Sequence, residues 1–148
     1  AARGGAGTPF ATGKTITTGH ANFNGLYPYG DSDIGIYRDE PVPVGNFAPN
    51  AYGLHDMHGN MWEWCRDWYS ESYYQHSPTD NPAGPDTGKK KVLRGGSWYT
   101  SSRSIRSANR NAADPETAIE DYGFRLIVDR LLHHKEKKEQ PLFFNEDF

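Results

Sequence analysis

The residues with the clearest chemical potential lie in one segment, 55–64, which reads His-Asp-Met-His-Gly-Asn-Met-Trp-Glu-Trp. Its two carboxylates, Asp56 and Glu63, lie on either side of Gly59-Asn60. They can converge if the chain wraps around an ion, and hard cations bind carboxylate and carbonyl oxygens. The alternative is that both carboxylates accept hydrogen bonds from loop amides, with no ion.

The same segment contains two histidines, His55 and His58, three positions apart. If they share a helix face they suit a transition metal, because imidazole binds zinc, copper and iron. On a turn around Gly59 the two side chains diverge instead, and both interpretations stay open. The single cysteine, Cys65, excludes an intramolecular disulfide and zinc sites built from several cysteines.

The elements that must position these residues are short. The 148 residues suffice for one domain of the usual size, about 100–200 residues. The 16 glycines and 10 prolines favour turns over long helices, and an aromatic content of 14% predicts a core that includes Trp62 or Trp64. Strands are predicted at Lys91–Arg94 and at 123–128, and one short helix at 66–76.

Charge and hydropathy exclude some partners. The 16 basic and 19 acidic residues give a formal net charge of -3, whereas nucleic-acid binders usually have a strong basic excess. No apolar run approaches the roughly 18 residues of a membrane-spanning helix. We therefore expect no nucleic-acid partner and no transmembrane segment in this chain.

Five short motifs occur in a fixed order along the chain. They are Ala-Ala-Arg-Gly-Gly at 1–5, the segment 50–64, Val-Leu-Arg-Gly-Gly-Ser-Trp at 92–98, Arg-Ser-Ala-Asn-Arg at 106–110, and Gly-Phe-Arg-Leu at 123–126. Over residues 1–129 this set resembles the formylglycine-generating enzyme (sulfatase-modifying factor) domain family. The resemblance implies an α+β fold that is a variant of the C-type lectin fold, loop-rich and with short strands.

The resemblance also implies that the domain is incomplete at its N-terminus. In such domains, the Ala-Ala-Arg-Gly-Gly motif follows a Leu-Pro-Thr-Glu-Ala-Glu-Trp-Glu-Tyr type of segment, which this sequence lacks. We expect an upstream segment or another polypeptide to complete it. Residues 130–148 are predicted to form a charged and aromatic C-terminal tail, and the family favours a bacterial, extracytoplasmic protein.

Calcium is the cofactor that the resemblance implies. Four residues match one calcium site of the family, where carbonyls join the two carboxylates: Asp56, Gly59, Met61 and Glu63. A second site, with less similar spacing, would use Asn22, Phe23 and Asp33.

Copper is not expected. Catalytic members of the family hold copper with a cysteine pair shortly after Gly-Gly-Ser, and residues 98–105 here contain no cysteine.

The family also includes noncatalytic members. We therefore predict a noncatalytic module that binds a protein or small-molecule ligand, or serves in assembly. The alternatives are an oxidoreductase module whose catalytic ligands lie outside this chain, and a structural subunit of a larger secretion, motility or surface complex.

The expected ligand or partner surface follows the Gly-Gly-Ser motif and extends to the Gly-Phe-Arg motif. Its short polar and tyrosine side chains suit adaptable recognition. The predicted surface consists of Trp98, Tyr99, Thr100, Ser102, Arg103, Asp121 and Tyr122.

Overall fold

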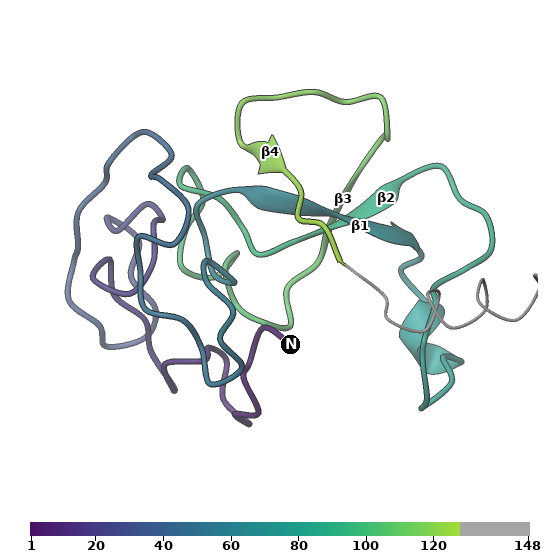
Figure 1. The fold of residues 1–148 in the computed structure, drawn as a ribbon, viewed down its shortest axis with the longest axis horizontal. Helices are drawn as coiled ribbons and strands as arrows, with labels where there is room; N and C mark the ends of the chain where they lie inside the picture. Colours follow the sequence, from purple (N-terminus) through teal and green to yellow (C-terminus); the bar gives the residue numbers. More distant parts are fainter. Residues whose placement is uncertain (128–148) are drawn as a thin grey trace, which may run out of the picture.

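One small sheet organises the part of the chain that the computed structural model describes, residues 1–127 (Figure 1). Its strands are β1 (Trp62–Trp68), β2 (Lys91–Arg94), β3 (Asn111–Ala113) and β4 (Tyr122–Gly123). They lie in the order β3-β2-β1-β4. Strand β2 is antiparallel to both β1 and β3, whereas β4 pairs with β1 in parallel.

Aromatic side chains on β1 form the core beneath the sheet. Trp62 is buried with Leu93 and Ala113, and Trp64 and Tyr122 pack against this cluster. The rings of Trp64 and Tyr122 meet edge to face at 5.4 Å, a favourable aromatic geometry. Alternate residues of a strand point to the same face, which places Trp62 and Trp64 together and Glu63 on the other side. The predicted aromatic core and the predicted strand at Lys91–Arg94 are confirmed.

A second core lies under the loops of residues 1–60, most of which gather to one side of the sheet in Figure 1. Phe10, Ile16, Phe23 and Ile105 are almost completely buried in it. His58 links two segments that contribute to this core. Its Nδ1 donates to the Ile105 carbonyl at 2.8 Å, while its Nε2 accepts from the Ala11 amide at 3.0 Å.

Helix is scarce within residues 1–127, and the α part of the α+β prediction is not confirmed. The predicted helix at 66–76 is wrong: β1 extends to Trp68, and only η1 (Tyr73–Gln75) is helical, as one 3-10 turn. Pairing of Trp68 with Lys91 on β2 satisfies backbone groups that a helix would have used. The Lys91 ammonium also lies 3.7 Å from the centre of the Trp68 ring, and this contact adds to the pairing.

The last strand is shorter than predicted. Only Tyr122 and Gly123 pair with β1, and the chain continues without further strand pairing to residue 127. No helix within residues 1–127 is long and apolar enough to cross a membrane. The predicted tail, residues 130–148, lies outside the described residues.

Candidate functional site

The loop before β1 turns tightly because three of its residues adopt the left-handed backbone conformation. Asp56, Gly59 and Asn60 all have positive φ, of 53°, 78° and 68°. At Gly59 the chain passes so close to Asn22 that a Cβ would lie 2.2 Å from the Asn22 carbonyl oxygen. Only glycine fits there, because it has no side chain and adopts positive φ at little cost. The winding brings Asp56 back toward the start of β1.

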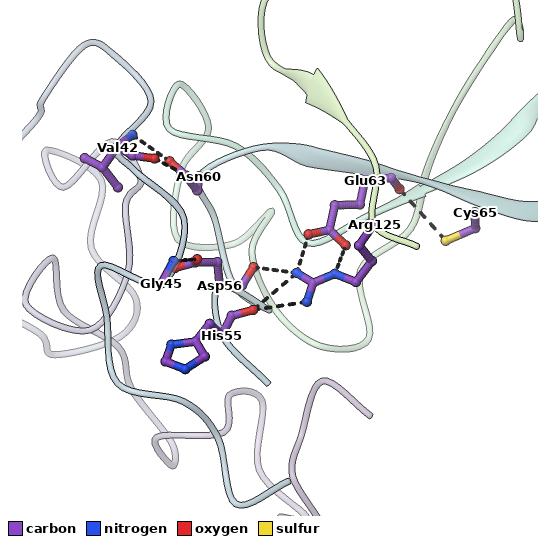
Figure 2. Close-up of polar contacts among 8 residues, drawn as sticks. All are labelled: Val42, Gly45, His55, Asp56, Asn60, Glu63, Cys65 and Arg125. Carbon is purple, nitrogen blue, oxygen red and sulfur yellow. Dashed lines mark hydrogen bonds and ion pairs between the residues drawn. The ribbon is translucent and has the colours of Figure 1, made fainter. Parts of the chain in front are cut away.

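The Asn60 side chain fixes this loop to its neighbours. Its Oδ1 accepts from the Val42 amide at 2.9 Å and from Asn22 Nδ2 at 3.1 Å, and its Nδ2 donates to the Val42 carbonyl at 3.0 Å. Figure 2 shows the paired contacts between Asn60 and Val42. Asn60 is 5% exposed, so these bonds form in a water-poor environment where unpaired partners are costly.

A cavity of about 430 Å³ lies between this loop and the end of β4. All four residues predicted for the first calcium site contribute to its wall: Asp56, Gly59, Met61 and Glu63. Gly123, Phe124 and Arg125 form the opposite side. The four predicted residues therefore line one cavity, although they come from a loop and a strand.

Arg125 also lines this site, although it was not among the residues predicted for the calcium set. Its guanidinium donates from Nε and Nη2 to both carboxylate oxygens of Glu63, and it also donates to the His55 and Asp56 carbonyls (Figure 2). The hydrogen bond to Glu63 raises the pKa of Arg125. The Gly-Phe-Arg motif marked this arginine, but nothing in the sequence indicated its partner.

The carboxylate of Asp56 offers an oxygen ligand that fits a hard cation. Its Oδ2 accepts a 2.6 Å hydrogen bond from the Gly45 amide, whereas its Oδ1 is buried and has no hydrogen-bond partner within residues 1–127. A buried carboxylate oxygen without a partner is unfavourable, and a calcium ion would satisfy it. Glu63 fits less simply, because Arg125 already neutralises it. Within residues 1–127 no three His, Cys, Asp or Glu side chains gather as a metal centre, so an ion here would depend on carbonyl donors.

The second predicted calcium set is less compact. Asn22 and Phe23 are fully buried, and Asn22 Oδ1 has no hydrogen-bond partner. Asp33 is exposed, and it makes no hydrogen bond to either residue in the described structure. Asn22 Nδ2 donates instead to the Glu40 carbonyl at 2.9 Å and to Asn60.

The two histidines have different partners. His55 Nδ1 lies 2.8 Å from the Phe47 carbonyl oxygen, and both ring nitrogens of His58 are engaged in the loop core. Burial lowers the pKa of His58, which keeps the ring neutral. The alternative of a transition metal shared by this pair is not supported, because both His58 nitrogens already have backbone partners.

Hydroxyl groups replace thiols after Gly-Gly-Ser, and they serve internal hydrogen bonds. Thr100 Oγ1 accepts from the Ser97 amide and donates to the Ser97 carbonyl, both at 3.0 Å. Ser102 Oγ donates to the Tyr27 carbonyl at 2.7 Å and is fully buried. The lone thiol lies elsewhere, on β1, and burial raises the pKa of Cys65, which disfavours the thiolate.

The predicted partner surface divides into buried and exposed residues. Trp98 and Ser102 are buried, Asp121 accepts a 2.7 Å hydrogen bond from Ser97 Oγ, and Tyr122 packs on Trp64. Thr100 is half-buried, while Tyr99, at 63% exposure, and Arg103 face solvent. The accessible part is therefore smaller than predicted.

Comparison with known proteins decides the family. Residues 1–130 match the family described as the sulfatase-modifying factor enzyme 1-like domain. The chain belongs to this family. This result confirms the resemblance inferred from the five motifs.

Relatives of this domain family include enzymes. The formylglycine-generating enzyme of Streptomyces coelicolor is 39% identical over 140 residues, which cover 87% of this chain and 43% of that protein. Two solved structures share the fold, each with a TM-score of 0.66 over 83% of this chain. PvdO from Pseudomonas aeruginosa is 34% identical, and the match covers 46% of its chain. Treponema denticola variable protein 1 is 30% identical, and the match covers 41% of its chain. The chain spans less than half the length of each.

Proposed function

We propose that this chain is a noncatalytic binding or assembly module of the sulfatase-modifying factor family. The observation that carries this proposal is the use of the hydroxyls after Gly-Gly-Ser. Thr100 and Ser102 hold their own loop together through internal hydrogen bonds, while the adjacent Tyr99 projects into solvent. Hydroxyls are poor ligands for copper(I), which prefers thiolates. A loop fixed in this way suits the presentation of a contact surface.

Calcium is proposed as a structural cofactor of this module. The unpartnered Asp56 Oδ1 and the shared cavity wall with Glu63 support it. Asp56 and Glu63 would supply charged oxygens, and the carbonyls of Gly59 and Met61 would supply neutral ones. The ion would fix the loop that precedes β1. Asn22, Phe23 and Asp33 are kept as a weaker second set, supported only by the unpartnered Asn22 Oδ1.

A further polypeptide segment is proposed to complete the domain. Strand β4 forms one end of the described sheet, and the apolar side chains beside it are open to solvent. Val44, Phe124 and Leu126 are 89%, 73% and 87% exposed. Such a strand edge readily pairs with another chain. We expect the isolated 148-residue chain to melt without cooperativity, as followed by near-ultraviolet circular dichroism. A monodisperse, cooperatively melting monomer would contradict this proposal.

A second candidate function is supported by the 39% identity to the Streptomyces enzyme. It is an oxidoreductase module whose catalytic ligands lie outside this chain. The two functions differ in a direct assay. Full-length protein is incubated aerobically with a sulfatase-type Cys-x-Pro-x-Arg peptide, with and without copper, beside the Streptomyces enzyme as positive control. We expect no formylglycine by mass spectrometry, and copper-dependent product would favour the oxidoreductase.

A further inference from the structure

A group of three aromatic rings lies at the surface where two distant segments meet. Tyr37 and Trp98 are stacked, with 6.5 Å between ring centroids and planes 20° apart. Tyr99 meets Trp98 edge to face at 5.6 Å. Trp98 is only 7% exposed, so it supports the group from below, while Tyr99 is 63% exposed. The accessible rings therefore belong to the two tyrosines.

Backbone hydrogen bonds extend this surface with apolar side chains. The Asn24 amide donates to the Thr100 carbonyl, and the Ser102 amide donates to the Tyr27 carbonyl, which places 24–27 beside the turn at 99–102. The Gly25 amide donates to the Ile36 carbonyl and adds that segment. Leu26, Tyr27 and Ile36 are 53%, 62% and 61% exposed. We call the combined surface the aromatic face; its members are Leu26, Tyr27, Ile36, Tyr37 and Tyr99.

Two acidic residues give the aromatic face a negative charge. The Tyr37 hydroxyl donates to Asp39 Oδ1 at 2.6 Å. This hydrogen bond is the main cause that raises the pKa of Tyr37 to about 12, and the charge of Glu120 is the smallest cause. Glu120 precedes Asp121, whose Oδ2 accepts a 2.7 Å hydrogen bond from Ser97 Oγ, one residue before Trp98. Asp39 and Glu120 are both exposed. The one ion pair within residues 1–127 joins Arg125 to Glu63, so neither Asp39 nor Glu120 forms an ion pair there.

The nearest basic side chain in the sequence points elsewhere. Arg38 donates to the Thr18 carbonyl at 3.0 Å, and its guanidinium lies 5.5 Å from the centre of the Phe47 ring. The aromatic face therefore combines tyrosine rings with two acids that form no ion pair within residues 1–127, and the exposed Arg103 follows the turn at 99–102. Ring faces attract cations, and nearby carboxylates strengthen that attraction.

We propose that the aromatic face binds a polypeptide segment that presents lysine or arginine among apolar residues. This inference rests on the proposed binding function and names the chemistry of its partner. The cationic groups would lie over the tyrosine rings near Asp39 and Glu120, while apolar side chains of the partner cover Leu26 and Ile36. Each cation–π contact at an exposed site is worth about 0.5–1 kcal/mol, or roughly a 2- to 5-fold change in Kd. Acidic segments are repelled by the same carboxylates.

A peptide selection tests this chemistry without assuming a sequence. Full-length protein is immobilised and used to select from a random peptide library, and the selected peptides are then measured by fluorescence anisotropy. We expect peptides with net positive charge and apolar residues. Asp39→Asn and Glu120→Gln each remove an exposed charge and should weaken binding roughly 1.4- to 5-fold. Tyr99→Leu, which keeps an apolar side chain but removes the ring, should do the same.

The matched controls are exposed residues outside the aromatic face. Asp80→Asn and Tyr52→Ala should leave Kd unchanged. Neutral or acidic selected peptides, or basic peptides indifferent to Asp39→Asn and Glu120→Gln, would overturn the inference on charge while leaving the binding function standing. Peptides whose binding is also unaffected by Tyr99→Leu would overturn both, because the surface itself would then be wrong.

Discussion

Replacement of Asn60 by alanine should lower the free energy of unfolding strongly. The loss should exceed that of any neighbouring loop substitution that leaves the hydrogen bonds intact. The side chain makes three hydrogen bonds, two partly buried ones with Val42 and one buried one with Asn22. Their removal costs about 1 kcal/mol each, or about 3 kcal/mol in total. Alanine at the left-handed φ of 68° adds about 1 kcal/mol. The expected loss is about 4 kcal/mol, a large part of the 5–15 kcal/mol typical of domains.

Two further variants separate these contributions in chemical denaturation of the full-length protein. Asn60→Gly removes the hydrogen bonds but tolerates positive φ, so it should cost about 3 kcal/mol. Asn81 is exposed and also left-handed, with φ of 48°, and makes no side-chain hydrogen bond in the described structure. Asn81→Ala should therefore cost only about 1 kcal/mol. If Asn60→Ala were no more destabilising than Asn81→Ala, the hydrogen bonds would not fix this loop.

Three other predictions concern the same loop. Gly59→Ala should lower the free energy of unfolding by about 2 kcal/mol more than Gly53→Ala, since both are left-handed but only Gly59 lacks room for a Cβ. Because the pKa of His58 is lowered, its contribution to the free energy of unfolding is complete above about pH 6.5 and decreases below that pH. His58→Gln should therefore reduce the loss of stability between neutral and acidic pH, as measured by chemical denaturation at several pH values. An unchanged slope of stability against pH would refute this prediction. Chelation should lower the melting temperature of the wild type but not of Asp56→Ala or Glu63→Ala, and indifference of the wild type to added calcium would remove the site.

Sequence patterns predicted the parts of the fold that depend on neighbours in the chain. Alternation placed Trp62 and Trp64 on one face, and the strand predicted at Lys91–Arg94 coincides with β2 at its observed bounds. The pattern failed at 66–76, because Arg66, Asp67 and Trp68 belong to β1, which pairs with β2. Tertiary pairing commonly overrides such weak local preferences.

The candidate site was only partly predictable for the same reason. Asp56 and Glu63 were predicted because they lie in one short segment that resembles a calcium site of the family, and both line one cavity. The Arg125–Glu63 pair joins residues far apart in the sequence, and it depends on the pairing of β1 with β4. Burial of Ser102 was also unexpected, since a hydroxyl is buried at low cost only when a distant acceptor, here the Tyr27 carbonyl, is in place.

Crosslinking from Tyr99 tests the central claim, that this domain acts by binding through its exposed aromatic surface. A photo-crosslinking amino acid is placed at Tyr99 in the full-length protein within its native cells, and the equally exposed Tyr52 serves as the control position. We predict that irradiation joins one defined partner to the Tyr99 position and not to the Tyr52 position, and that Asp39→Asn reduces the yield. A partner captured only from Tyr52, with none from Tyr99, would contradict the account.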